Sequence, residues 1–352
     1  MAPAVVERTW RESTPEGVER DLAALWRELA GRGDIARAVM SNLIVFRLHD
    51  RRHSRRPDAP GVPDVLDVID VVDVIDGVVA RHPSRTIVIE HDRGDHNPSA
   101  PVGARVSVTV FGPPTAQYAV EQVVIRSACA EMSLPSIVRR FVRGDVPTSV
   151  WWMEDLSRVG PLPALVGTGR QFLYDSRRWR DVGGGVRALA PLLATGRIDL
   201  SDLNWRRLAP MRLALEHATG SMSTVPDVSD VSDGEVRIAH RPGEAPLAAL
   251  LAGWLVARLG WSPDRWPAID EVASDAAGSD VLSLRIGQGA ESLAATLDEH
   301  RVRVEQPRTP ALVVAVPRSV EAESVAAELR ALSVDAALRD ALIALVRRYA
   351  LA

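Results

Sequence analysis

The sequence predicts a mixed α/β (α+β) fold with two related strand-helix-three-strand-helix modules joined by a central αβ segment. Short β-branched, apolar runs alternate with stretches whose apolar residues recur at helical spacing. The same order of elements returns in the second half of the chain. The 352 residues, 46% of them hydrophobic, suffice for about two domains. We expect an N-terminal module at residues 1–145 and a C-terminal domain at residues 146–352, with a bridging segment at 146–201 and the second module at 202–352.

A helix of about four turns is predicted near the start of the chain. Ser13 and Glu16 have the spacing of a capping box, and Pro15 suits a first helical turn. The apolar residues that follow share one face of this helix: Val18, Leu22, Leu25, Trp26 and Leu29.

The rest of the first module is predicted to alternate strands and helices. A buried strand at residues 42–46 precedes a polar loop at 51–63 and a helix at 68–80, which His82 and Pro83 end. Aspartates at every third position from 64 to 76 drift around a helix, so the first part of that tract is expected to be solvated. Further strands are predicted at 86–90, 105–110 and 122–127, and a short helix at 135–142.

The second half is predicted to repeat this order after the bridging segment. The bridge and the start of the second module hold strands at 148–153 and 172–174 and helices at 186–194 and 202–217. Beyond a Ser-rich loop with Asp227, Asp230 and Asp233, we expect a strand at 236–239, a helix at 247–259, strands at 281–286, 302–304 and 312–316, a helix from residue 320, and a last helix whose apolar face includes 338, 342, 345 and 349. Matched strands lie at nearly equal offsets of about 190 residues, which suggests a duplication.

Composition excludes several classes of chemistry. All 42 basic residues are arginines, so a Schiff base, a pyridoxal-phosphate anchor and a P-loop lysine are excluded. Cys129 is the single cysteine, so neither an internal disulfide nor a thiolate metal cage can form. The formal charge of −4 argues against binding to nucleic acid or an anionic membrane. With no export signal and no apolar run of about 18 residues, we expect a cytoplasmic protein.

No catalytic or metal-binding set is predicted, and no cofactor. His91 and His96 flank Asp92 and Asp95, but nothing regular fixes their spacing, so a solvated loop is the better interpretation. The Asp triplets lack the spacing of an EF-hand, and no GxSxG motif is present. Cys129 follows a strand rich in Val and Ile, which favours a buried structural thiol.

Three sites could attract an anion. Gly167 and Gly169 begin a GxGxxG motif, but Phe172 occupies the place of its third glycine. The run Gly183, Gly184, Gly185 precedes a helix and could hold a phosphate on free amides, although a turn that lets the helix pack is the alternative. The arginines between residues 51 and 56 are compensated by the Asp tract that follows.

Tryptophan and arginine mark two stretches that fit no catalytic template. Trp151 and Trp152 are neighbours in a strand, so their side chains point to opposite faces. Either both rings are core, or one meets a partner protein. Trp205 is flanked by Arg206 and Arg207, two residue types that are common at interface hot spots. A buried structural role for Trp205 is equally open.

At these residues the chain resembles the bacterial glucose-6-phosphate dehydrogenase assembly protein family. The matching segments appear in family order over most of the chain, and the stretch DLNWRRLAP is the most specific. They are NLIV at 42–45, HPSR at 82–85, SVWW at 149–152, YDSR at 174–177 and DLNWRRLAP at 202–210.

The resemblance implies a non-catalytic partner that binds glucose-6-phosphate dehydrogenase and promotes its active oligomer or raises its affinity for substrate. That enzyme opens the oxidative pentose phosphate pathway and supplies NADPH. The family brings no catalytic residues, and a lone cysteine gives no basis for redox control. An effector of this kind acts through a coupling free energy of about 1–3 kcal/mol.

Our hypothesis is that the matched motif residues form the contact surface for the dehydrogenase. They are Trp151, Trp152, Asp175, Ser176, Arg177, Asp202, Asn204, Trp205, Arg206 and Arg207. The alternative is an enzyme or sensor that binds a sugar phosphate or nucleotide at the helix start of Gly183, Gly184 and Gly185, beside Arg177, Arg178 and Arg180.

Overall fold

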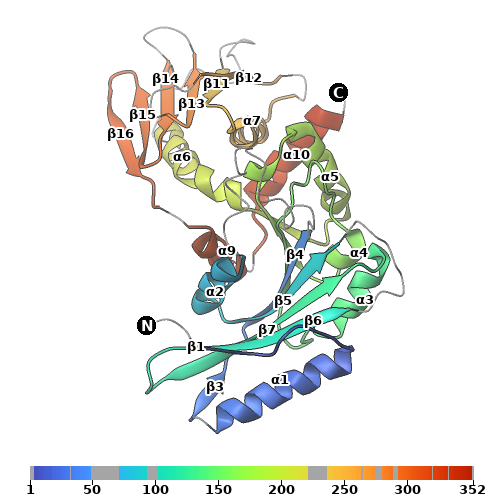
Figure 1. The fold of residues 1–352 in the computed structure, drawn as a ribbon. Helices are drawn as coiled ribbons and strands as arrows, with labels where there is room; N and C mark the ends of the chain where they lie inside the picture. Colours follow the sequence, from blue (N-terminus) through green and yellow to red (C-terminus); the bar gives the residue numbers. More distant parts are fainter. Residues whose placement is uncertain are drawn as a thin grey trace, which may run out of the picture. The chain divides into compact units, whose positions relative to one another are not determined.

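The computed structural model divides into two compact units, each discontinuous in sequence (Figure 1). It describes residues 4–31, 33–48, 71–92, 102–220, 236–262, 265–273, 280–287, 292–318, 320–331 and 333–350. Unit 1 comprises Met1–Glu154, Pro161–Tyr174 and Glu321–Leu332, and unit 2 comprises Asp155–Gly160, Asp175–Val320 and Ser333–Ala352. The predicted boundary at residues 145 and 146 therefore falls inside the first stretch of unit 1.

Unit 1 is built on a mixed sheet with strand order β1-β6-β7-β5-β4-β8-β9, to which β2 and β3 add through β6 and β7. The strands are β1 Ala4–Glu7, β2 Arg11–Glu12, β3 Ile35–Arg37, β4 Ser41–Leu48, β5 Ser84–His91, β6 Gly103–Phe111, β7 Gln117–Ser127, β8 Thr148–Trp152 and β9 Gln171–Tyr174. The neighbours from β7 to β9 are parallel, whereas β6 is antiparallel to β7 and to β1. In chain order the parallel strands lie 3-2-1-4-5, as in doubly wound folds.

The central strands of unit 1 are buried on both faces. In β4 the six residues from Ser41 to Phe46 are buried, which explains the continuous apolar run seen in the sequence. Phe46 stacks on Trp152 of β8, with ring centroids 4.0 Å apart and an interplanar angle of 6°. The structure confirms the strands predicted in this part of the chain, at 42–46, 86–90, 105–110, 122–127, 148–153 and 172–174. The ends of each strand differ from the predicted bounds by at most a few residues.

The helices of unit 1 are α1 Pro15–Ala30, α2 Val71–Arg81, α3 Leu134–Arg139, α4 Pro163–Val166 and α9 Glu321–Arg330. Helix α1 is confirmed and packs on β6, but its N-cap is Thr14 and not Ser13. The Thr14 hydroxyl accepts a hydrogen bond from the Gly17 amide at 3.2 Å. Because Thr14 is the cap, Glu16 stands one position too early to close a capping box. Helices α2 and α9 pack side by side (Figure 1).

Unit 2 holds a six-stranded sheet with order β12-β11-β13-β14-β15-β16, covered by α6 (Figure 1). The strands of this sheet are β11 Val236–His240, β12 Ala268–Glu271, β13 Leu282–Ile286, β14 Leu293–Leu297, β15 Arg301–Gln306 and β16 Thr309–Ala315. The residues of unit 2 also include strand β10 Asp199–Asp202, which is not part of this sheet. The helices are α5 Val182–Thr195, α6 Leu203–Gly220, α7 Ala245–Leu259 and α10 Ala336–Ala350. Helix α10 packs against α5 and α7.

The mixed α/β class is confirmed, but the predicted duplication is wrong. The matched strands β4 and β5 are parallel, whereas β11 and β13 are antiparallel. The reason is β12, which the sequence did not predict. The chain crosses from β11 through α7 into β12, which pairs parallel to β11, and β13 then pairs with the other side of β11. The unpredicted β14 separates β13 from β15, so an antiparallel meander replaces the parallel arrangement.

Several sequence predictions fall outside the described residues. These are the polar loop and its arginines, the first part of the first Asp tract, residues 68–70 of the predicted helix, Asp95 and His96, and the triplet at 227, 230 and 233. Within the described ranges, none of the helices is long and apolar enough to cross a membrane.

Candidate functional site

The motif residues of unit 2 meet in one buried hydrogen-bonded network. Asp202 ends β10, and its Oδ1 accepts hydrogen bonds from the backbone amides of Ser176 at 3.0 Å and Asn204 at 2.9 Å. The Asn204 side-chain amide donates to the Ser176 hydroxyl at 3.0 Å. The YDSR segment is thereby joined to the start of the DLNWRRLAP segment.

Arg207 extends this network to helix α7. Its Nη1 donates to Asn204 Oδ1 at 2.9 Å, and its two terminal nitrogens each lie 2.8 Å from an oxygen of Glu244. This two-pronged pairing suits the planar guanidinium and fixes its direction. Glu244 is the residue before the first turn of α7, so Arg207 links α6 to the beginning of that helix.

Two buried carboxylates give the network its electrostatic character. Asp202 is 1% exposed, and its burial, together with the nearby charge of Asp175, raises its pKa to about 7. Asp202 Oδ2 has no hydrogen-bond partner among the described residues. Asp175 is held by Arg177, whose backbone amide and guanidinium both donate to it, with Nη2 2.5 Å from Oδ2.

Trp205 connects α6 to the beginning of α10. The indole N–H donates to Asp335 Oδ2 at 2.7 Å, and Asp335 Oδ1 accepts from the Leu338 amide at 2.9 Å. The Arg212 guanidinium lies 3.7 Å from the centre of the Trp205 ring. Burial lowers the pKa of Arg212, and the Asp335 carboxylate opposes that effect. The ring, the cation and the carboxylate therefore form one packed group.

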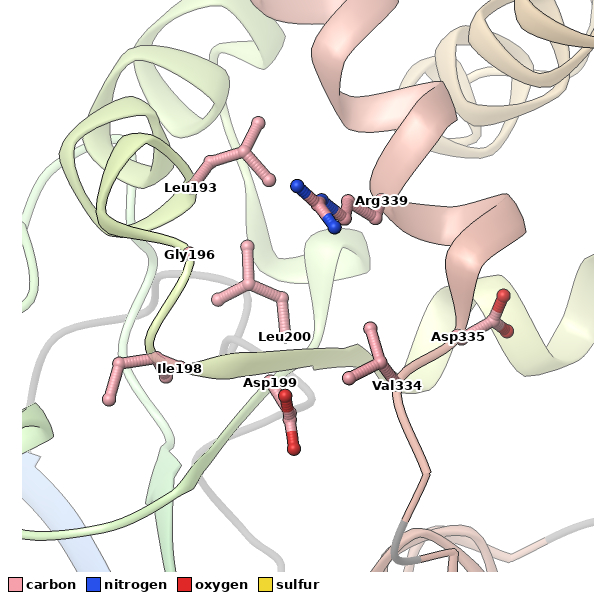
Figure 2. Close-up of a pocket in the computed structure, with 8 residues that line it drawn as sticks. All are labelled: Leu193, Gly196, Ile198, Asp199, Leu200, Val334, Asp335 and Arg339. Atoms are coloured by element: carbon pink, nitrogen blue, oxygen red, sulfur yellow. The ribbon is translucent and has the colours of Figure 1, made fainter.

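A pocket lies beside this group, and Asp335 belongs to its lining (Figure 2). It is formed by the end of α5, strand β10 and the beginning of α10, and it is partly open to solvent, with a cavity volume of about 50 Å³. Its apolar lining consists of Leu193, Ile198, Leu200 and Val334. The guanidinium of Arg339 points into this space, toward Leu193 and Leu200.

Most of the predicted contact residues are buried in the chain itself. Trp151 and Trp152 are 1% and 0% exposed, so both rings belong to the core and neither is presented to a partner protein. Of the two interpretations of the sequence, the core interpretation is therefore confirmed. The other buried members are Asp175, Ser176, Asp202, Asn204 and Trp205. The side chain of Arg177 is 44% exposed, that of Arg207 is 29% exposed, and Arg206 is exposed. The contact role stays a prediction, and a direct contact could be made by these arginines.

The HPSR segment serves the core of unit 1. Arg85 and Glu121 are 3% and 1% exposed and form an ion pair, with Nη1 3.0 Å from Oε2. The Trp26 indole donates to the other oxygen of Glu121 at 2.5 Å. The family-like segment therefore holds α1, β5 and β7 together.

The glycines at the start of α5 have an acceptor within the chain. Asp181 caps the helix, and its carboxylate accepts hydrogen bonds from the amides of Gly183 and Gly184 at 3.0 and 2.9 Å. A Cβ on Gly185 would lie 2.3 Å from the Trp179 ring. The close contact between Gly185 and Trp179 supports the alternative in which these glycines let the helix pack. An external anion would have to displace Asp181 from the two amides.

No group of three or more metal-ligating side chains occurs within the part of the chain that the structure describes. The solvated-loop interpretation is wrong for His91 and Asp92, which are 0% and 6% exposed. The reason is that β5 runs on to His91 beside β7, and the Asp92 amide then donates to the Ser127 carbonyl at 2.9 Å. Cys129 is buried, as predicted.

The sequence interpretation missed four residues of the site: Arg212, Glu244, Asp335 and Arg339. Asp335 carried a readable signal, because an aspartate three residues before Leu338 at the beginning of an apolar helical pattern is typical of an N-cap. Glu244 carried none, since its partner Arg207 is distant in sequence. Arg212 follows Trp205 by two turns of the same helix, a spacing that places both on one face.

Two family models match the chain in consecutive stretches. The model described as the glucose-6-phosphate dehydrogenase subunit N-terminal domain matches residues 76–191, and the model of its C-terminal domain matches residues 198–342.

Two curated proteins, each described as an OxPP cycle protein, OpcA, are similar to the chain. The one from Nostoc punctiforme is 23% identical over 193 residues, which are 53% of this chain and 40% of that protein. The one from Synechococcus elongatus is 26% identical over 179 residues, which are 48% of this chain and 38% of that protein. The match therefore spans less than half the length of these relatives.

Similarity to solved structures is weak. An oxidoreductase from Magnetospirillum magnetotacticum has a TM-score of 0.35 and 12% identity, covering 90% of this chain and 99% of that one. The UDP-N-acetylglucosamine 3-dehydrogenase GnnA from Acidithiobacillus ferrooxidans has a TM-score of 0.35 and 10% identity, covering 89% of this chain and 98% of that one. Neither likeness supports an inference about this chain.

Proposed function

Because the chain belongs to the family of glucose-6-phosphate dehydrogenase subunits, we propose that it is a non-catalytic accessory protein that binds this dehydrogenase in the cytoplasm and promotes its assembly and allosteric activation. The proposal rests on two family models, which describe the N-terminal and the C-terminal domain of the dehydrogenase subunit. They match residues 76–191 and 198–342 of this chain, in that order.

The chemistry of the motif residues supports a binding role. Asp175 is held by Arg177, and Arg207 is held by Glu244 and Asn204. Side chains that are hydrogen-bonded to one another in this way are fixed in position, so they can support a rigid surface. A rigid surface can favour one state of a partner, which is all that an effector requires.

The proposed activation is a difference in binding. If the chain binds the active form of the dehydrogenase more tightly than the inactive form by about 1–3 kcal/mol, it shifts the equilibrium between them by roughly 5- to 150-fold. By linkage, the substrate that favours the active form must strengthen the complex by the same factor.

The test is a kinetic titration of the dehydrogenase from the same organism. NADPH formation is followed at several glucose 6-phosphate concentrations while the chain is added up to micromolar concentration. We expect the KM for glucose 6-phosphate to fall about fivefold or more. The chain without the dehydrogenase is the control and should form no NADPH. Unchanged KM and kcat at micromolar chain would contradict the activation that we propose.

A further inference from the structure

The six-stranded sheet of unit 2 has two edge strands that differ in length and charge (Figure 1). At one edge, β12 has four residues and ends with two exposed acidic residues, Asp270 and Glu271. Short edge strands with charged side chains keep other strands from pairing with them. At the other edge, β16 has seven residues, and none of them is charged. The β16 edge therefore lacks the protection that the β12 edge has.

Strand β16 leaves backbone groups without partners. Among the described strands it pairs with β15 alone, and directly after it the Val316 amide donates to the His300 carbonyl at 2.7 Å. In an antiparallel pair, residues that bond the neighbouring strand alternate with residues whose backbone groups face away from it. The amides and carbonyls of Val313 and Ala315 therefore point away from β15, and none of the described residues bonds them.

The side chains along this edge are apolar. On the side of the sheet that α6 covers, Leu312 and Val314 are partly buried. On the opposite side, Ala311, Val313 and Ala315 are exposed. Another strand that paired with residues 311–315 would meet no charged side chain in them, and it would cover apolar surface on both sides of the sheet.

The charges on the neighbouring strand match those of a second copy of the chain. On the side of the sheet that Val313 occupies, β15 presents three exposed charged residues, Arg301, Arg303 and Glu305. Arg301 lies beside Ala315 at the end of β16, whereas Glu305 lies near the beginning of β16. Two copies of β16 can pair antiparallel with Val313 on the two-fold axis. The arginine at 301 in each copy then shares a row with the glutamate at 305 in the other.

Only two alanines separate the opposite charges in such a row, Ala315 of one copy and Ala311 of the other. Neighbouring strands lie about 4.8 Å apart, so the row spans about 14 Å between the outer Cα atoms, which extended arginine and glutamate side chains can bridge. If the pairing shifts by two residues, Arg301 and Arg303 share a row instead, and their like charges repel. The charge pattern therefore favours one register between identical strands, and it sets no such match for an unrelated strand.

We propose that the chain forms a two-fold dimer through β16, with the two sheets joined into one. The backbone groups of Val313 bond their counterparts in the second copy, and Arg301 faces Glu305 of the second copy. Within one copy, this glutamate contacts Arg303 and this arginine contacts Asp298, so the dimer adds a second opposite charge to each. The dimer goes beyond the proposed function. It presents every other surface of the chain twice, so that one dimer can engage two subunits of an oligomeric partner.

Sedimentation velocity of the full chain alone, from about 1 to 100 µM, tests for a reversible dimer with an interface of this small size. Val313→Pro is the test variant. The proline ring replaces an N–H that points away from β15, so no hydrogen bond within the sheet is lost. Val313→Thr is the matched control, because threonine keeps both the N–H and the branched side chain. Thermal melts followed by circular dichroism check that both variants fold.

We expect a dimer in the wild type and in Val313→Thr, and a dissociation constant at least about tenfold higher in Val313→Pro. A wild type that sediments as a monomer at every concentration would overturn the proposal. Equal dissociation constants for the wild type and Val313→Pro would place the interface elsewhere. A monomeric wild type whose binding to the dehydrogenase is lost in Val313→Pro would assign the edge to a segment of that enzyme, against the dimer.

A charge exchange tests the register. Glu305→Arg places like charges in both outer rows, so we expect it to weaken the dimer. Combining it with Arg301→Glu exchanges the two charges and should restore the dimer. If the double variant dimerises no better than Glu305→Arg, the two strands do not pair with Val313 on the axis.

Discussion

The indole of Trp205 contacts Arg212 of its own helix α6 and Asp335 at the beginning of α10. Its N–H bonds Asp335, and its face meets Arg212, while its apolar surface is 3% exposed. Trp205→Ala should therefore lower the free energy of unfolding by roughly 3–5 kcal/mol, because it leaves a cavity and removes the partner of Asp335. Urea denaturation checks this value. A loss below about 1 kcal/mol would mean that Trp205 does not hold α6 and α10 together.

Asp202 makes the stability of the folded protein depend on pH. Its pKa is raised to about 7 in the folded protein, above its usual value of 3.8, so the folded chain keeps a proton that the unfolded chain loses. The stability that this proton supports is present at low pH and is lost as the pH rises from about 4 to 7, by at most about 1.4 kcal/mol per pH unit.

Asp202→Asn separates this effect from the rest of the protein. The amide oxygen can still accept the bonds from Ser176 and Asn204, and the side chain no longer ionises. Relative to the wild type, the variant should therefore gain stability between pH 5 and pH 8 in denaturant titrations. Parallel stability profiles for the two proteins would show that Asp202 is ionised throughout this range.

Residue types in the site were predictable from the sequence, but their burial was not. The motif segments pointed to Asp175, Asp202 and Trp205, and the structure joins them in one unit. Polar residues of this kind are usually exposed, so a sequence gives no sign that Asp202 and Asn204 will be buried together. Glu244, the partner of Arg207, and Asp335, the partner of Trp205, are tens of residues away in sequence, and only tertiary structure brings them near.

At the scale of elements, the start of α5 depends on a glycine without a side chain. A Cβ at Gly185 would lie 2.3 Å from the Trp179 ring, and the nearby Asp181 caps the same helix. Gly185→Ala should destabilise the protein by about 1–3 kcal/mol, because the ring must move. Gly160→Ala is the control, since nothing lies within 4 Å of its Cβ position. Equal melting temperatures for the two variants would contradict the close packing of Trp179.

The elements predicted correctly from the sequence are those in which apolar residues form a long run or recur at regular spacing. The buried strands β4, β5 and β7 and the amphipathic helix α1 carry such patterns along their whole length. The missed strands β1, β2, β3, β10, β12 and β14 have between two and five residues, too few for a period to be recognised. Because β12 and β14 change how their neighbours pair, missing them produced a false duplication from a real similarity in spacing.

At the scale of the whole molecule, family membership extends across both units. The N-terminal domain model covers most of the parallel strands of unit 1, and the C-terminal model covers the unit 2 sheet and the beginning of α10. Most motif residues are buried and stabilise the unit in which they lie. A chain can therefore carry specific, family-like motifs without presenting most of them at its surface.

We propose that the chain binds glucose-6-phosphate dehydrogenase and promotes its assembly. Sedimentation velocity of the dehydrogenase at micromolar concentration, with and without an equimolar amount of the chain, measures both effects. We expect the chain to sediment with the dehydrogenase, the dehydrogenase to shift to a larger oligomer, and glucose 6-phosphate to strengthen the complex. Two boundaries that sediment independently, at the rates of the separate proteins, would contradict it.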